Sequence, residues 1–174
     1  MNSALLMENL RSIPDFPIKG ILFWDVTTLF KHPDCLREIV DSLYEQYKDA
    51  GITKVVGVEA RGYVIGAALA LRLGAGFVMA RKPGKLPAET WSESYTKEYG
   101  EDRLEIHCDA ISSEDVVLIH DDLLATGGTV AAVSRLVGRF NPQKQYMGFI
   151  ISLKDVPRVE AFPEDVETFS LLNL

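Results

Sequence analysis

Cysteine is scarce in this 174-residue chain, and long apolar runs are missing from it. The two cysteines, Cys35 and Cys108, have no close spacing, which argues against a disulfide or zinc framework and favours a reducing compartment. No apolar run approaches the length of a membrane span. Residues 1–11 carry Glu8 and lack the basic start and apolar core of a signal peptide. We therefore expect a cytoplasmic protein with no membrane partner.

Positive charge is also in short supply. The formal net charge of -7 disfavours nucleic acid or an anionic membrane surface as a partner. Apolar residues make up 47% and charged residues 25% of the chain, the balance of a folded globular protein rather than a disordered or fibrous one. A chain of this length predicts a single domain that spans residues 1–174.

Several familiar catalytic motifs are incomplete or absent. Residues 57–62 have the glycine spacing of a P-loop, but Tyr63 and Val64 stand where Lys and Ser or Thr are required. Residues 74–76 lack the third glycine of a dinucleotide fingerprint, and no serine or cysteine has the context of a nucleophile elbow. The histidines, none of them at metal-ligand spacing, are His32, His107 and His120. Although His120 neighbours an acid pair, its position is more typical of a packed residue at a strand end than of a base.

The most informative segment runs from Val117 to Thr129. A β-branched apolar run leads to Asp121 and Asp122, a Thr-Gly-Gly-Thr turn follows at residues 126–129, and apolar residues then recur at helical spacing. The start of such a helix offers unpaired N–H groups and the positive end of its dipole to a phosphate. The carboxylates can accept from sugar hydroxyls or hold the waters of Mg²⁺. This order predicts a site for a phosphorylated sugar, rather than a turn in which aspartate and glycine serve only as a cap.

One long stretch of the acidic chain contains no acid. Residues 61–88 lack Asp and Glu altogether. The basic residues of this stretch are Arg61, Arg72, Arg81, Lys82 and Lys85. The pattern favours a small, highly charged anion as a ligand over a chance gap, although a solvated helix face would explain Arg72.

Strands and helices are expected to alternate along the chain. The periodicity predicts an N-terminal helix that ends at Pro14, an irregular hood segment over residues 13–24 and a long, polar, mobile lid over about residues 83–101. Further helices are expected at 33–49, at 62–73 and after the glycine turn, and strands at 54–59, 76–80, 104–107, 117–122, 146–153 and 166–169. This order predicts an α/β fold with a mostly parallel central sheet flanked by helices, and with a small hood over about residues 1–30.

Polar clusters fall at the expected carboxyl ends of three strands, at residues 59–62, 81–82 and 121–122. Because the carboxyl ends of parallel strands share one edge of a sheet, these clusters are expected to converge. The predicted site has no obvious nucleophile and many anion contacts. It suits the transfer of a group whose bond breaks largely by dissociation while the protein stabilises charge, and phosphoribosyl transfer from a pyrophosphorylated ribose is such a reaction.

Residues 121–129, Asp-Asp-Leu-Leu-Ala-Thr-Gly-Gly-Thr, resemble the diphosphoribose-binding signature of type I phosphoribosyltransferases. The likeness covers nearly the full chain in the right order. The other matching motifs are Ile13–Pro17 with Gly20–Phe23, Glu59–Gly62, Arg81–Pro87, and Glu98–Gly100 followed by Leu104–His107. The signature indicates the superfamily, and the hood and lid motifs indicate the members that use adenine.

The resemblance implies an enzyme of purine salvage that joins adenine to 5-phosphoribosyl 1-pyrophosphate, giving AMP and pyrophosphate, with Mg²⁺ as cofactor and as a homodimer. Glu98 would handle the proton lost from the purine. The implied contacts of the phosphoribosyl donor are Glu59, Ala60, Arg61, Arg81, Lys82, Lys85, Tyr99, Asp121, Asp122, Ala125, Thr126, Gly127, Gly128 and Thr129. The implied contacts of adenine are Leu22, Phe23, Trp24 and Ile150.

Within these sets, the resemblance assigns the 5-phosphate to residues 125–129 and the ribose hydroxyls to Asp121 and Asp122. The same two acids would hold the metal through water. The basic residues would meet pyrophosphate, in part from the neighbouring subunit, and the Glu59–Ala60 peptide would be cis.

Trp24 departs from the pattern of the family, which usually has Arg or Lys after the hood phenylalanine. A charged side-chain contact is therefore absent there, while the indole can extend the stacking surface. Two alternatives remain open from the sequence: phosphoribosyl transfer to another purine base, and a non-catalytic sensor of the phosphoribosyl donor. Such regulators tend to carry an added basic part that binds nucleic acid, and this acidic chain shows none.

Overall fold

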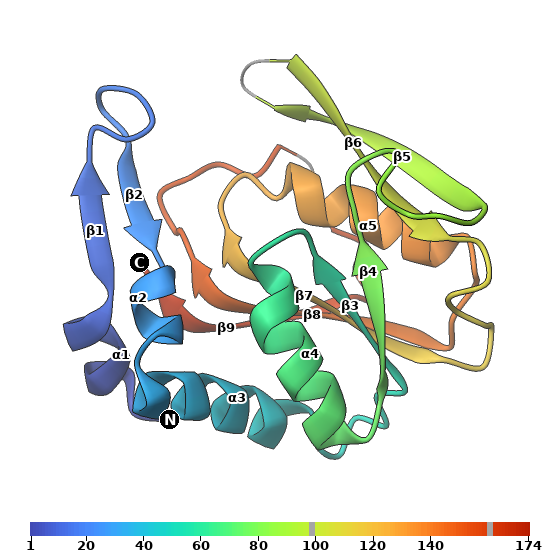
Figure 1. The fold of residues 1–174 in the computed structure, drawn as a ribbon, viewed down its shortest axis with the longest axis horizontal. Helices are drawn as coiled ribbons and strands as arrows, with labels where there is room; N and C mark the ends of the chain where they lie inside the picture. The colour runs from blue at the N-terminus through green and yellow to red at the C-terminus, as the bar shows by residue number, and fades with distance from the viewer. Residues whose placement is uncertain (98–99, 160–161) are drawn as a thin grey trace.

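A five-stranded parallel sheet forms the centre of the molecule (Figure 1). The computed structural model describes residues 1–97, 100–159 and 162–174. The strand order is β4-β3-β7-β8-β9, and each neighbouring pair is parallel. The strands are β3 (Lys54–Val58), β4 (Gly76–Ala80), β7 (Val116–Leu124), β8 (Lys144–Ser152) and β9 (Glu167–Asn173). The predicted α/β fold with a mostly parallel sheet is confirmed.

Helices cover both faces of this sheet. Helices α3 (Pro33–Tyr47) and α4 (Gly62–Leu73) pack on one face, and α5 (Gly128–Gly138) packs on the other. Successive strand residues point to opposite faces, so Val55 belongs to the core beneath α3 and α4 while Val56 belongs to the core beneath α5. The sheet is thus buried on both sides, as the apolar character of its strands requires.

Two antiparallel ribbons lie on opposite sides of the sheet (Figure 1). The hood consists of α1 (Ser3–Asn9), β1 (Arg11–Pro14), β2 (Leu22–Asp25) and α2 (Thr27–Phe30). The second ribbon is a hairpin of β5 (Thr90–Lys97) and β6 (Gly100–His107), which packs against α5. Glu93 of the hairpin accepts hydrogen bonds from Arg135 Nε at 2.8 Å and from Arg139 Nη2 at 2.7 Å.

The N-terminal segment differs from its prediction. The first helix ends at Asn9 instead of continuing to Pro14, because Arg11–Pro14 pairs with β2. The two ends of the expected irregular segment, residues 13–24, are therefore strands of a ribbon, while its middle, residues 15–21, is irregular as expected. A long-range strand pairing overrides the helical spacing of the apolar residues here.

Two further segments also depart from expectation. Strand β7 does not end at the acid pair but continues to Leu124, because its last residues still pair with Ile151 and Ser152 of β8. Within the expected lid, residues 83–101, the described residues 90–97 and 100–101 are strand and not loop. Beyond the lid, β6 buries Leu104 and Ile106 in the core. The mobility of the lid stays a prediction.

The remaining elements lie close to their predicted positions. Helix α4 and strand β4 have the predicted bounds, and α4 is capped by Gly74, whose φ of 69° is a left-handed conformation that glycine adopts readily. Helix α3 begins at Pro33 as predicted and ends at Tyr47. Among the helices in the described part of the chain, none combines the length and the apolar character that a membrane crossing needs.

Candidate functional site

The carboxyl ends of three neighbouring strands meet at one edge of the sheet. Strand β3 lies between β4 and β7, and its register aligns its last residue with the last residue of β4 and aligns Gly57 with His120 of β7. Glu59 follows β3, Arg81 follows β4, and Asp121 follows His120, so these three residues share the same edge. The predicted convergence of the polar clusters is confirmed.

The acid pair lies at the centre of this edge. Asp122 is 3% exposed, and its Oδ2 atom forms an ion pair with Arg61 Nε at 2.7 Å. Burial, and then the neighbouring Asp122 carboxylate, raise the pKa of Asp121 well above its ordinary value. When two neighbouring carboxylates repel each other, hydroxyl donors or a nearby cation stabilise their charged forms. The pair therefore suits sugar hydroxyls and a hydrated metal ion.

Helix α4 begins in close contact with the acid pair. A Cβ atom at Gly62 would lie 2.8 Å from the backbone oxygen of His120 and 3.2 Å from Oδ1 of Asp121. Only glycine allows the start of α4 to approach β7 so closely. The Glu59–Ala60 peptide just before it is cis, as predicted.

Glu59 holds the basic residues that follow β4. Its carboxylate accepts hydrogen bonds from Nε and Nη2 of Arg81, each at 3.3 Å, and from the backbone N–H of Lys82 at 2.9 Å. These two donors, the Lys82 amide first, hold the pKa of the Glu59 carboxyl below its ordinary value. Arg81 Nη1 also donates to the backbone oxygen of Lys85 at 3.1 Å. The structure thus brings together four of the residues predicted to contact the phosphoribosyl donor, with the Glu59 carboxylate orienting Arg81 and Lys82, and Arg81 in turn bonded to Lys85.

The glycine turn encloses a small hollow at the start of α5. Gly127 has φ 84°, a left-handed conformation, and precedes the first residue of the helix. The hollow has a volume of about 80 Å³. Its lining, here named the anion hollow, is Asp121, Leu123, Leu124, Ala125, Thr126, Gly127, Thr129 and Val130. Because the first N–H groups of a helix have no partner within it, a hollow at this point is suited to an anion.

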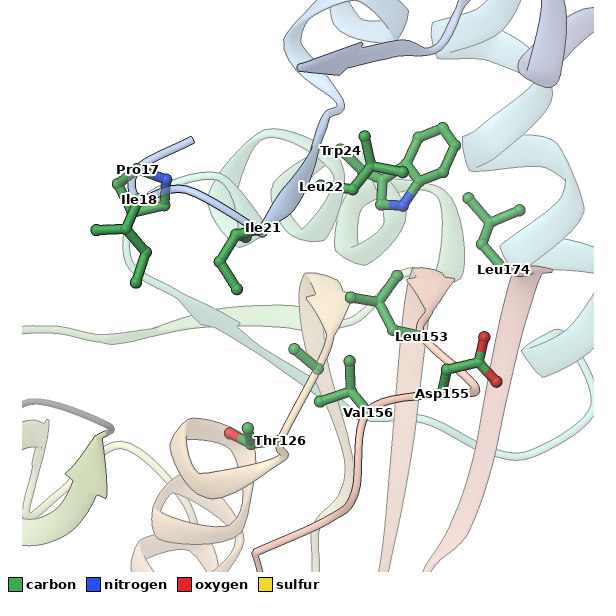
Figure 2. A pocket seen from close by; sticks show the side chains of 12 residues that line it. Pro17, Ile18, Ile21, Leu22, Trp24, Thr126, Leu153, Asp155, Val156 and Leu174 are labelled. Carbon is green, nitrogen blue, oxygen red and sulfur yellow. The ribbon is translucent and has the colours of Figure 1, made fainter. Parts of the chain in front are cut away.

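A larger, mainly apolar cavity lies between the hood and the carboxyl end of β8 (Figure 2). Its volume is about 750 Å³. Its lining, here named the hood cavity, is Pro17, Ile18, Gly20, Ile21, Leu22, Trp24, Ala125, Thr126, Leu153, Asp155, Val156 and Leu174. Since Ala125 and Thr126 also line the anion hollow, the two spaces are neighbours. A mainly apolar space beside a small hollow at a helix start fits a base and its 5-phosphate.

The predicted adenine contacts divide between two faces of β2. Leu22 and Trp24 line the hood cavity, whereas Phe23 lies on the other face, with its ring centroid 5.6 Å from the guanidinium carbon of Arg61. Ile150 is fully buried in the core and is not in the lining of the cavity. Leu153, three residues further on, points into the cavity instead (Figure 2).

His120 is a packed residue, as its position suggested. It is fully buried, and its Nδ1 atom lies 2.9 Å from the backbone oxygen of Gly148. Burial lowers the pKa of His120 to about 4, so the ring is neutral at physiological pH. Two other predicted site residues, Glu98 and Tyr99, lie outside the described residues.

Sequence reasoning missed the segment that follows β8. Leu153 and Val156 line the hood cavity, and Arg158 donates hydrogen bonds to backbone oxygens on both sides of the site. A single arginine in an irregular stretch carries no periodic signal, and Ala125, its acceptor in the phosphate turn, lies 33 positions away. The proximity of this stretch to a parallel strand end was the available clue.

Comparisons with known proteins agree with this geometry. The model of the phosphoribosyl transferase domain matches residues 25–169. An adenine phosphoribosyltransferase of Phocaeicola vulgatus is 64% identical over 174 residues, with 100% of both chains covered.

Two solved structures agree in fold as well as in sequence. The adenine phosphoribosyltransferase of Rhodothermus marinus shares 45% identity with a TM-score of 0.91, covering 98% of this chain and 97% of its own. The enzyme of Giardia lamblia in complex with 9-deazaadenine shares 34% identity with a TM-score of 0.93, covering 100% of this chain and 98% of its own. The chain therefore belongs to the phosphoribosyltransferase family.

Proposed function

We propose that the chain is an enzyme of purine salvage that transfers the 5-phosphoribosyl group of 5-phosphoribosyl 1-pyrophosphate to adenine, giving AMP and pyrophosphate. One observation carries the proposal: the acid pair, of which Asp122 is buried, stands beside an anion hollow that shares Ala125 and Thr126 with a larger apolar cavity. Together these spaces match the ribose, the 5-phosphate and the base of the product. The full-length likeness to adenine phosphoribosyltransferases supports the choice of reaction.

The donor contacts follow from the charges at the sheet edge. The 5-phosphate accepts from the N–H groups at the start of α5 and from the hydroxyls of Thr126 and Thr129, with Gly127 and Gly128 allowing close approach. The ribose hydroxyls donate to Asp121 and Asp122.

Pyrophosphate is bound by the basic residues of the acid-free stretch. These are Arg61, Arg81, Lys82 and Lys85. The ion pair of Arg61 with Asp122 uses Nε, so the terminal amino groups of the same guanidinium can bind an anion while Nε holds the acid. The peptide of Glu59 and Ala60 shapes the backbone beside this anion, and the Glu59 carboxylate orients Arg81 and Lys82.

The chemistry needs no protein nucleophile. The bond between C1 of the ribose and the pyrophosphate oxygen breaks, N9 of adenine forms the new bond to C1, and the N9 proton leaves the base. The protein contributes by fixing the two reactants and by stabilising the charge that moves onto pyrophosphate. Glu98 on the lid is the proposed acceptor of the proton, with Tyr99 beside it, and closure of the lid would exclude water from the cationic ribose.

The acid pair fits Mg²⁺ as a cofactor. The described residues hold no cluster of three or more His, Cys, Asp or Glu side chains that could bind a metal ion alone. Mg²⁺ typically keeps several waters and binds one or two carboxylates together with phosphate oxygens of the substrate. Asp121 and Asp122 would hold it through water, and the ion would supply positive charge to the departing pyrophosphate.

Adenine is proposed to bind between the hood and the segment after β8. Leu22, Trp24 and Leu153 border this space, and Phe23, on the other face of β2, lies against Arg61, which pairs with Asp122. Ile150 would act from the core behind this wall. The solved relative from Giardia lamblia was crystallised with 9-deazaadenine, which supports adenine as the base.

A homodimer and a cytoplasmic location complete the proposal. Large apolar side chains are exposed on α4 and β4, with Leu71 84%, Val64 46% and Met79 44% exposed. A surface of this kind suits contact with a second copy, which would bring basic residues of the neighbouring subunit to pyrophosphate. The free Cys35 and Cys108 agree with a reducing compartment.

The test is a side-by-side assay of adenine, hypoxanthine, guanine and xanthine with 5-phosphoribosyl 1-pyrophosphate and Mg²⁺. We expect AMP and pyrophosphate from adenine, and turnover of a 6-oxopurine at an equal or better rate would refute the choice of base. Donor binding without turnover of any base would favour a non-catalytic sensor. The Glu98→Gln variant should lower kcat much more than donor affinity, and an unchanged rate would remove Glu98 from the chemistry.

A further inference from the structure

Arg158 lies in the irregular segment after β8 and contacts both the phosphate turn and the wall of the hood cavity. We propose that it is a positioning residue that orients the backbone of residues 125–127 for the 5-phosphate and ties that turn to the base-binding wall. The proposal rests on the proposed function, because it names how the same site is held.

The contacts of Arg158 converge on backbone oxygens. Its Nη1 atom donates to the backbone oxygens of Ala125, of Leu153 at 3.2 Å and of Val156 at 3.3 Å. Its Nη2 atom donates to Oγ of Ser152 at 2.8 Å. One planar guanidinium thus joins the phosphate turn, the end of β8 and the segment that follows it, and its fork geometry is suited to several acceptors at once.

A neighbouring backbone hydrogen bond also restrains the phosphate turn. The Val159 N–H donates to the backbone oxygen of Thr126 at 2.9 Å. Two successive carbonyls of the turn, those of Ala125 and Thr126, are therefore held from the side of the 158–159 segment.

This arrangement determines where the turn directs its N–H groups. In a trans peptide the C=O bond of one residue and the N–H bond of the next point in opposite directions. When the carbonyls of Ala125 and Thr126 face Arg158 and Val159, the N–H groups of Thr126 and Gly127 face away from that segment. Donors fixed in this way before the phosphate arrives lose less freedom on binding, which strengthens the interaction.

The side chain also packs against the glycine of the turn. A Cβ atom at Gly127 would lie 3.5 Å from Cδ of Arg158 and 3.1 Å from Cζ of Phe162. The left-handed Gly127 is therefore covered by the stem of Arg158 as well as bonded through the adjoining residues. Packing and hydrogen bonding restrain the turn together.

The same guanidinium reaches the base-binding side. Leu153 and Val156, whose carbonyls accept from Arg158, direct their side chains into the hood cavity (Figure 2). A change in this wall is thus transmitted to the phosphate turn through one side chain. We expect the loss of Arg158 to weaken binding of the donor and of adenine, while leaving the acid pair in place.

The experiment compares Arg158→Ala and Arg158→Lys with the control Lys154→Ala, a change at an exposed side chain of the same segment. Affinity for 5-phosphoribosyl 1-pyrophosphate is measured by calorimetry, and hydrogen exchange is followed at the amides of residues 126–129. Removing a charge-assisted hydrogen bond predicts a donor Kd raised about tenfold or more in Arg158→Ala. Lysine keeps the charge but not the fork, so Arg158→Lys should show a smaller loss.

Three results would support the proposal: faster exchange at residues 126–129 in Arg158→Ala, partial recovery of donor affinity on adding methylguanidinium at constant ionic strength, and a control that behaves as the wild type. A donor Kd unchanged within about twofold, or a raised Kd without faster exchange, would overturn it. Arg158→Lys serves the same comparison if the alanine variant does not fold. Failure of the wild type to bind the donor would refute the proposed function instead, and the exchange measurement would still judge the role of Arg158.

Discussion

The closeness of α4 to the acid pair predicts that a single methyl group at position 62 damages both the fold and the site. In Gly62→Ala the new Cβ would stand 2.8 Å from the backbone oxygen of His120, inside the closest normal contact. That oxygen belongs to β7, which is paired on both sides by β3 and β8 and cannot withdraw easily. Overpacking of this kind costs about 1–3 kcal/mol, while alanine in place of glycine in a helix gains about 0.5–1 kcal/mol.

We therefore expect a net loss of about 1–2 kcal/mol in the free energy of unfolding, measured by urea denaturation. Donor affinity should fall as well, because the clash pushes against Asp121, whose Oδ1 would lie 3.2 Å from the new carbon. The matched control is Gly138→Ala at the end of α5, where a new Cβ would lie 3.7 Å from Gln145 Nε2, an ordinary van der Waals contact. A Gly62→Ala variant that is as stable as the wild type and binds the donor equally well would refute this reasoning.

Two further predictions concern charged groups. Asp122→Asn should lower donor affinity about tenfold or more, because it removes a buried carboxylate paired with Arg61. The control Asp41→Asn, at an ion pair with Arg72 on the surface, should change the affinity little. Equal donor Kd values for Asp122→Asn and the wild type, measured by calorimetry, would contradict the ribose role. A hydrogen bond from Thr27, assisted by Arg11, lowers the pKa of Asp25 from 3.8 to about 2, so this carboxylate stabilises the fold above pH 3.8 and the contribution is lost as the pH falls toward 2. In Asp25→Asn the Tm should therefore vary less over that range, and an unaltered acid profile would count against the assignment.

Elements with local signals could be predicted closely from the sequence. Helix α4 begins at Gly62 and ends before Gly74, and both glycines are visible as punctuation around a run of small apolar residues. The anion hollow was equally accessible, because an acid pair, two glycines and two threonines occupy one short segment.

Features that depend on distant partners could not be read in this way. The apolar residues after Asn9 have helical spacing, but Arg11–Pro14 pairs with β2 and forms a strand instead. No local sequence pattern predicts this pairing. Arg158 is separated by 33 positions from Ala125, one of its acceptors, so only the folded chain reveals the contact. Ile150 has the expected apolar character for a base contact, and only the folded chain shows that it is fully buried and outside the lining of the hood cavity.

The alternation of side chains along β2 determines which sequence changes can alter the preference for the base. Neighbouring side chains of this strand serve different spaces, with Leu22 and Trp24 at the hood cavity and Phe23 at Arg61. Deleting one residue within the strand would exchange these roles all at once. Lengthening the connection at residues 15–21, which also lines the cavity, would leave the three side chains of β2 on their faces. Single substitutions in β2 can therefore change the base preference gradually, whereas an insertion or deletion within the strand would change every contact at once.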